Sequence, residues 1–338
     1  MHVPYRQLSE YIPVDVQKLR PQGSYKKLIE KRTHAIDHLI DRFGKIPDDL
    51  LITRTCPTCG ASDWHAELEK DHLKIVRCHS CSLVYVNPAF DEAHYREVYG
   101  SAEYQAIMKD LGEASHEYRT VRFGNERVEI MSRYLRPLDG ERPRYLDVGC
   151  STGFVVEAAR SKGWEATGID LNPSAIEFGR ARGLDLRNVG LEDVDFPTDS
   201  FHAISLFDVL EHLMHPRKML QACVDLLRPE GVIFLYVPNY DSASRLLMGR
   251  DAHFIWPTHH LNYYTPVTIA ELLSRSGLRV ELLMTEGLDI VDYIWYRQEV
   301  RHEQVDALAE VADTLQFLAN AGCYGKNLRV LARKSAAA

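Results

Sequence analysis

A regular alternation of strand-like and helix-like segments runs through the middle of the chain. The segments RYLDVGC, EATGID, HAISLFDV and GVIFLYVPN are short, apolar and β-rich, and amphipathic segments of helical period lie between them. Strands that alternate with helices across short turns form right-handed βαβ units and a mainly parallel sheet. We therefore predict an α/β protein whose centre is a Rossmann-like, doubly wound sheet.

The rest of the chain divides into stretches of different character. Residues 1–50 are charged and helix-prone, which predicts a helical arm with one apolar face made of Leu28, Ile36, Leu39, Ile40 and Phe43. Residues 51–90 contain paired cysteines and end in an apolar run, so we expect a small separate module. Residues 91–338 hold the alternating core, and a helical insertion near 289–322 is expected before the last strand.

Composition and charge limit the classes of function. The chain has 338 residues, and its 48 acidic and 40 basic side chains give a net charge of -8. This charge repels polyanions and disfavours nucleic acid as a partner. The mean hydropathy of -0.27 is ordinary for a globular protein. Since no apolar run is long enough for a signal peptide or a membrane span, we expect a cytoplasmic protein that does not associate with membranes.

The paired cysteines indicate a metal site. Cys56 and Cys59 form one CxxC pair, and Cys78 and Cys81 form a second pair after 18 intervening residues. This is the spacing of a zinc ribbon, in which four thiolates close a tetrahedral shell around a structural Zn²⁺. Redox chemistry normally uses one such pair rather than two, so zinc is the preferred interpretation.

A glycine-containing turn follows the first strand of the alternating core. Gly149 and Gly153 in DVGCSTGF would let the backbone approach a ligand at the carboxyl edge of the sheet. Asp170, which ends the next strand, is placed to accept hydrogen bonds from a ribose diol. A dinucleotide fingerprint would have glycine where Ser151 and Phe154 stand. The pattern therefore favours another adenosine-containing cofactor.

Several motifs in order resemble the class I S-adenosylmethionine-dependent methyltransferases, in particular the UbiG-like and bacterial small-molecule groups. They are YLDVGCSTGF, EATGIDLNP, EDVDFPTDSFHAISLFDVLEHLMHP, LLRPEGVIFLYVPN and HHLNYYTPVTIAELLSRSGL. The resemblance implies a seven-stranded sheet and S-adenosylmethionine as cofactor, with Cys150 as a tolerated small residue of the loop. It also implies these cofactor-binding residues: Asp147, Gly149, Cys150, Gly153, Phe154, Asp170, Leu171, Leu191, Glu192, Phe207 and Asp208.

Polar residues that follow the fourth and fifth strands are candidates for the chemistry. Asp208, Glu211 and His212 have the spacing i, i+3, i+4, which would place them on one face of a starting helix. His259 and His260 lie on a later loop that would overhang the same edge of the sheet. In one interpretation Asp208, Glu211, His212 and His260 bind a divalent ion such as Mg²⁺. In the other no metal is present, and His260 or His259 packs or acts as a base.

These observations predict a methyltransferase for a small-molecule acceptor. We expect O-methylation of a sugar, nucleotide sugar or natural-product intermediate, with catalytic contributions from His260, His259 and His212. The alternatives are an RNA methyltransferase that grips its substrate with the ribbon, a C- or N-methyltransferase, and a non-catalytic S-adenosylmethionine-binding scaffold. Four basic and four acidic side chains cancel between Arg54 and Cys81, which lowers the RNA alternative. The helical arms are candidate homodimer contacts.

Overall fold

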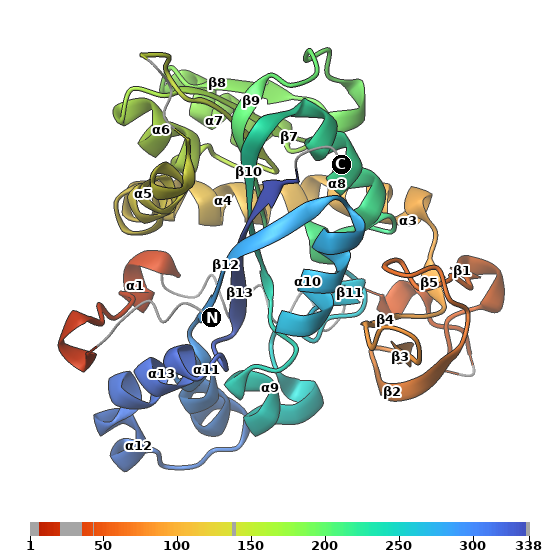
Figure 1. Cartoon of the computed structure of the whole chain (residues 1–338). Helices are drawn as coiled ribbons and strands as arrows, with labels where there is room; N and C mark the ends of the chain where they lie inside the picture. Colours follow the sequence, from red (N-terminus) through yellow and green to blue (C-terminus); the bar gives the residue numbers. More distant parts are fainter. Residues whose placement is uncertain (1–6, 21–35, 43, 137–139, 336–338) are drawn as a thin grey trace.

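A mixed sheet of seven strands forms the centre of the computed structural model, which describes residues 7–20, 36–42, 44–136 and 140–335 (Figure 1). The strand order is β12-β13-β10-β9-β6-β7-β8. The strands are β6 (Arg144–Val148), β7 (Glu165–Asp170), β8 (Asp185–Asn188), β9 (Phe201–Phe207), β10 (Leu227–Pro238), β12 (Leu278–Glu286) and β13 (Asn327–Lys334). From β10 to β8 all neighbours are parallel, whereas β13 lies antiparallel between β10 and β12. The Rossmann-like α/β prediction is confirmed.

Helices cover both faces of this sheet. Leu146, Ile204 and Ile233 pack in one core cluster with α8 (Pro216–Leu226) and α10 (Pro266–Arg275). The residues that precede these three in sequence, Tyr145, Ala203 and Val232, pack in a second cluster with α5 (Asn125–Tyr134), α6 (Phe154–Ser161) and α7 (Pro173–Ala181). Successive residues of a strand point to opposite faces, so the strands must be apolar on both sides. The predicted helices of the alternating core are confirmed.

Further helices flank the sheet in sequence. Before β6 the chain forms α3 (Glu92–Gly100), α4 (Ala102–Arg119) and a π turn, Thr120–Gly124, that leads into α5. Between β10 and β12 lie α9 (Ala243–Met248) and β11 (Asn262–Tyr263). The helices α11 (Asp289–Trp295), α12 (Asp306–Glu310) and α13 (Ala312–Ala321) separate β12 from β13. They occupy the position predicted for the helical insertion, and Figure 1 shows them together with α9 at one end of the molecule.

The cysteine-containing segment packs directly against the seven-stranded sheet. Its strands are β2 (Trp64–Lys70), β3 (Leu73–Cys78) and β4 (Val84–Val86), and β11 completes a four-stranded sheet with them in the order β11-β4-β3-β2. β1 (Leu51–Ile52) pairs with β5 (Ala89–Phe90) beside it. Tyr85 lies in the same core cluster as Leu210 and Tyr264. The expectation of a separate module was therefore wrong, because β11 and this shared core join the two parts.

The described parts of the N-terminal arm contain only short helical turns. They are α1 (Val16–Leu19) and the 3-10 turns Leu8–Glu10, Asp37–Leu39 and Asp48–Leu50. Leu28 and Phe43 of the predicted apolar face lie outside the described residues. The stretch from Ile36 to Ile40 holds one 3-10 turn rather than a continuous helix. Among the helices described, none combines the length and apolarity needed to cross a bilayer.

Candidate active site

The predicted cofactor loop connects β6 to α6 and has the backbone shape that its glycines suggested. Gly149 has φ 77° and Gly153 has φ 80°, a region that residues with a Cβ rarely occupy. A Cβ on Gly149 would lie 2.5 Å from Cγ2 of Val209. Glycine is therefore required both for the turn and for its close approach to the segment after β9.

Asp170 is fixed by two backbone groups at the carboxyl end of β7. Its Oδ2 accepts a hydrogen bond of 2.8 Å from Ser151 N–H, and its Oδ1 accepts one of 2.8 Å from Asn172 N–H. A carboxylate oxygen can accept more than one hydrogen bond, so both oxygens retain capacity for a ligand. Burial raises the pKa of this carboxyl. The geometry suits the predicted contact with ribose hydroxyls.

Asp147 is a buried member of the predicted cofactor set. It is 2% exposed, and its Oδ1 accepts a hydrogen bond of 2.5 Å from the hydroxyl of Ser205, which also bonds Tyr145 at 2.5 Å. Burial raises the pKa of Asp147 to about 7. This side chain supports the loop from behind, so any effect of its carboxylate on the cofactor would be indirect.

The remaining predicted cofactor residues differ in accessibility. Leu171 is 65% exposed and Glu192 is also exposed, as expected of residues at an open cofactor-binding edge. Leu191 and Phe207 are buried, at 7% and 8% exposure. Cys150 is 2% exposed, and burial raises the pKa of its thiol well above the usual value. This environment agrees with a packing role for Cys150 rather than a nucleophilic one.

A cavity of about 370 Å³ lies beside this loop, at the carboxyl edge of the sheet. This volume is within the range of small-molecule sites. The wall beside the cofactor loop contains Ser151 and Phe154, and Asp208 after β9. Its other walls come from distant parts of the chain and include Val14, Leu19, Arg20, Arg119, Arg127, Glu211, His212, Tyr236, His253, Phe254, Trp256, His260, Glu286, Leu288, Lys326 and Arg329.

Two arginines of the cavity were missed by sequence reasoning. The guanidinium carbon of Arg127 lies 4.1 Å from the ring centre of Phe207 and 4.8 Å from that of Tyr236. Arg119 donates from Nε to Ser115 Oγ at 2.7 Å. Among the described residues, no carboxylate lies within ion-pair distance of either guanidinium. Arg127 is buried and Arg119 is partly buried, and these cations would complement an anionic group of a bound molecule.

Glu211, His212 and His260 come together at the cavity wall. One ligand atom from each lies within 4.8 Å of the others. Both Glu211 oxygens are buried and accept no hydrogen bond within the described part of the chain, and burial raises the pKa of this carboxyl well above its usual range. A buried carboxylate needs a partner, and a divalent ion or a proton would supply one. Two imidazoles and one carboxylate favour a transition-metal ion over Mg²⁺.

The backbone fixes which nitrogen of each imidazole carries a proton in the neutral form. His260 Nδ1–H donates to the Phe254 carbonyl at 2.8 Å, and His212 Nδ1–H donates to the His259 carbonyl at 3.0 Å. A carbonyl oxygen can only accept, so Nε2 is the basic nitrogen of both rings. Nε2 is the atom that would bind a metal ion or take a proton.

Two details of the predicted chemistry are corrected. Asp208 has φ 57°, and only Leu210–His212 forms a 3-10 turn, so Asp208, Glu211 and His212 do not share a helix face. Asp208 lies outside the group that could hold a metal ion. The ring of His259 stacks on the ring of Trp256 with centroids 3.5 Å apart, and His259 does not line the cavity. His260 is the histidine of this pair that faces the cavity.

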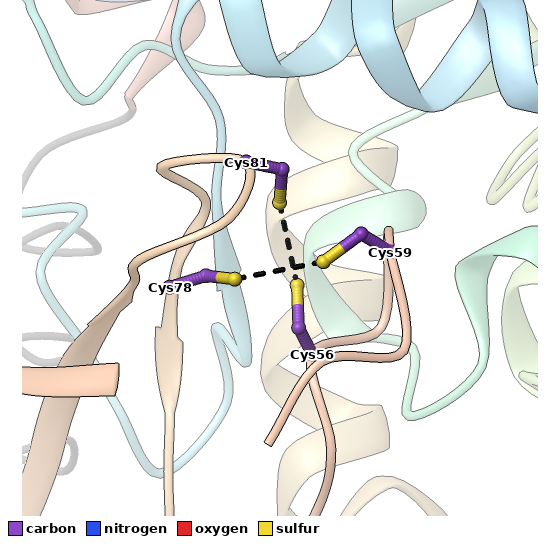
Figure 2. Close-up of side chains that lie close together, drawn as sticks. All are labelled: Cys56, Cys59, Cys78 and Cys81. Atoms are coloured by element: carbon purple, nitrogen blue, oxygen red, sulfur yellow. Dashed lines mark hydrogen bonds between the residues drawn. The ribbon is translucent and has the colours of Figure 1, made fainter. Parts of the chain in front are cut away.

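The four ribbon cysteines converge as their spacing predicted. Figure 2 shows their sulfur atoms pointing to a common centre. Cys56 Sγ lies 3.5 Å from Cys81 Sγ, and Cys59 Sγ lies 3.5 Å from Cys78 Sγ. Zn–S bonds of 2.3 Å in a tetrahedron require sulfur separations of about 3.8 Å. The set therefore fits a Zn²⁺ ion with only a small adjustment.

Comparisons with known proteins match most of the seven-stranded sheet. Residues 119–283 match a methyltransferase domain family. The ubiquinone biosynthesis O-methyltransferase of Xanthomonas axonopodis pv. citri (strain 306) is 32% identical over 168 residues, 46% of this chain and 69% of that protein. The protein of the same name from Xylella fastidiosa (strain 9a5c) is 32% identical over 169 residues, 46% of this chain and 67% of that protein.

A solved structure supports the fold. A chain of the complex between the Haloferax volcanii Trm112 methyltransferase activator and a methyltransferase has a TM-score of 0.50 and 15% identity. The match covers 69% of this chain and 98% of that one.

The seven-stranded sheet, the glycine loop after β6 and Asp170 at the end of β7 are together the features of a class I S-adenosylmethionine-dependent methyltransferase. The chain belongs to this family, as the matched domain and the relatives show. It is an enzyme that methylates a small molecule with S-adenosylmethionine.

Proposed function

We propose that this enzyme transfers the methyl group to a hydroxyl oxygen of a small acceptor, namely a sugar, a nucleotide sugar or a natural-product intermediate. The observation that carries the proposal is the group of Glu211, His212 and His260 at the cavity wall. A hydroxyl needs to lose its proton during attack, and this group offers basic nitrogens beside the cofactor loop. The related proteins are O-methyltransferases by name, which also supports an oxygen acceptor.

The cofactor side of the cavity would bind and orient S-adenosylmethionine, which supplies an electrophilic methyl carbon on a sulfonium. Asp170 would accept hydrogen bonds from the ribose hydroxyls, and the exposed Leu171 would cover the adenine. Arg119 and Arg127 would attract the methionyl carboxylate, because neither has a carboxylate partner among the described residues. Holding the methyl carbon in line with the acceptor oxygen would supply much of the acceleration.

Proton removal would fall to the acceptor side. The acceptor oxygen forms its bond to the methyl carbon while the carbon–sulfur bond breaks, and the electron pair of that bond stays on sulfur. The hydroxyl proton would pass to His260 Nε2, whose ring is oriented by the Phe254 carbonyl. If Glu211, His212 and His260 hold a divalent ion, its charge would lower the pKa of the hydroxyl instead.

The test combines an acceptor panel with substitutions at this group. Phenolic, sugar and nucleotide-sugar hydroxyl compounds are incubated with S-adenosylmethionine, and S-adenosylhomocysteine release is followed. With the best acceptor, H260A should lower turnover by about 10²–10⁴-fold and change its pH profile. S-adenosylhomocysteine affinity should stay within about twofold, and exposed His215→Ala serves as the control. A fully active H260A enzyme with an unchanged pH profile would refute the base, and activity insensitive to EDTA would refute the metal.

A further inference from the structure

The strand that follows His260 belongs to the ribbon sheet. β11 pairs antiparallel with β4, with Asn262 opposite Tyr85 and Tyr263 opposite Val84. Val86 N–H donates to the Leu261 carbonyl at 3.0 Å. Because β11 starts two residues after His260, the ribbon fixes the chain immediately beside the cavity (Figure 1).

Asn262 connects this strand to the turn that carries Glu211 and His212. Its side-chain amide is 1% exposed and donates to the Leu210 carbonyl at 3.1 Å and to the Leu213 carbonyl at 2.8 Å. Leu261 N–H also donates to the Glu211 carbonyl at 2.6 Å. These bonds set the separation between His260 on one segment and Glu211 and His212 on the other.

Arg54 of the ribbon completes the connection. Its Nη2 donates to Asn262 Oδ1 at 3.2 Å and to the Met214 carbonyl at 3.1 Å. Its own backbone N–H donates to Asn87 Oδ1 at 2.9 Å. One guanidinium thus joins the start of the ribbon, two residues before Cys56, to both segments of the cavity wall. Its donation to Oδ1 also holds the Asn262 amide in the orientation in which its nitrogen can donate to the Leu210 and Leu213 carbonyls.

We propose that Arg54 is a positioning residue for the acceptor side of the active site, and that the ribbon is the rigid support through which it acts. The ribbon then orients His260 against Glu211 and His212, in place of the substrate-gripping role of a nucleic-acid-binding ribbon. The inference rests on the proposed function only in assigning these three residues to the acceptor side.

The test is amide hydrogen exchange on the full chain, for wild type, Arg54→Met, Asn262→Ala and the control Lys74→Met. Lys74 is exposed on β3 of the same ribbon. In Arg54→Met, exchange in peptides covering residues 209–215 and 254–264 should accelerate about tenfold or more, because the hydrogen bonds of a partly buried charged donor are lost. Peptides covering residues 144–153 and the affinity for S-adenosylhomocysteine should change less than twofold. Asn262→Ala should accelerate the same two segments, and Lys74→Met neither.

A second readout reports on the imidazoles themselves. In protein labelled with carbon-13 at the histidine Cε1 positions, the resonances of His212 and His260 should move in Arg54→Met and Asn262→Ala but not in Lys74→Met. Exchange and resonances of Arg54→Met that match the control would overturn the proposal. So would acceleration spread equally over residues 144–153, since that is general destabilisation. Neither measurement needs turnover or a known acceptor, so failure of the proposed function would leave this result readable.

Discussion

Asp292 contacts three residues that line the cavity, and its charge is the first quantity to test. The side chain is fully buried in α11, with Arg20 Nη1 at 2.8 Å, Lys326 Nζ at 2.6 Å and His253 Nδ1 at 3.8 Å. Asp292→Asn keeps the shape and removes the charge that both cations share. Breaking a buried ion pair lowers the free energy of unfolding by about 3–5 kcal/mol. Because the Arg20 and Lys326 side chains retain 16% and 14% exposure, we expect a loss at the lower end of this range, about 3 kcal/mol.

The pH dependence of this loss has a definite sign. Burial alone would raise the pKa of Asp292, but Arg20 and Lys326 hold it well below its usual value. An acid whose folded pKa is depressed stabilises fully above its unfolded pKa, about 3.9, and this stabilisation fades as pH falls below it. The free-energy gap between wild type and Asp292→Asn should therefore narrow only below about pH 4, because protonation of the neighbouring His253 can only widen it above that pH.

Urea unfolding at several pH values measures this gap, with exposed Asp306→Asn on α12 as the matched control. Limited proteolysis should also cut Asp292→Asn faster between residues 7 and 20, because Arg20 anchors that segment to α11. An Asp292→Asn protein as stable as the control, or a free-energy gap that fails to narrow below about pH 4, would refute the reasoning.

Four further predictions concern the cofactor loop, the cavity and the ribbon. Burial raises the pKa of Asp147 to about 7, so the free energy of unfolding of the wild type should fall by up to about 4 kcal/mol between pH 4 and 7. Asp147→Asn should remove this pH dependence, as urea titrations at several pH values would show. Gly149→Ala should weaken S-adenosylhomocysteine binding more than about tenfold in calorimetry, because the new Cβ meets Val209. Arg127→Met should weaken the same binding about tenfold, with exposed Arg142→Met unaffected. Cys56→Ser should contain less zinc than wild type in elemental analysis and should lower the Tm by several degrees.

Sequence reasoning succeeded where local pattern and global structure agree. The apolar strands are buried on both sides, the glycines have positive φ, and the two CxxC pairs meet at one centre. In these cases the residue type alone indicates the structure, because few side chains other than glycine fit a left-handed turn and few other than cysteine form a sulfur tetrahedron. The spacing of Asp208, Glu211 and His212 was misleading, since a helix-like interval predicts a helix face only if a helix forms there.

Long-range pairing was the part that local patterns could not supply. β11 is two residues long, and its alignment with β4 depends on tertiary packing rather than on its own propensity. The aromatic surroundings of Arg127 come from α6, β9 and β10. One signal was available in the sequence. Arg127 lies on the buried face of α5 beside Val128 and Met131, and an arginine on an apolar helix face indicates a functional or paired cation because charged side chains are rarely buried.

Some residues that line the cavity lie within the part of the chain that matches the family, and others lie outside it. The family match spans residues 119–283, which supply the glycine loop, Asp170 and the Glu211–His212–His260 group. Arg20 of the N-terminal segment, Glu286 and Leu288 after β12, and Lys326 and Arg329 at β13 lie outside that range but line the same cavity. In the proposed mechanism, cofactor binding and proton removal thus fall to the matched domain, whereas much of the wall beside the acceptor lies outside the matched residues. Since selectivity is set by the groups that touch the acceptor, we expect its acceptor to differ from those named for its relatives.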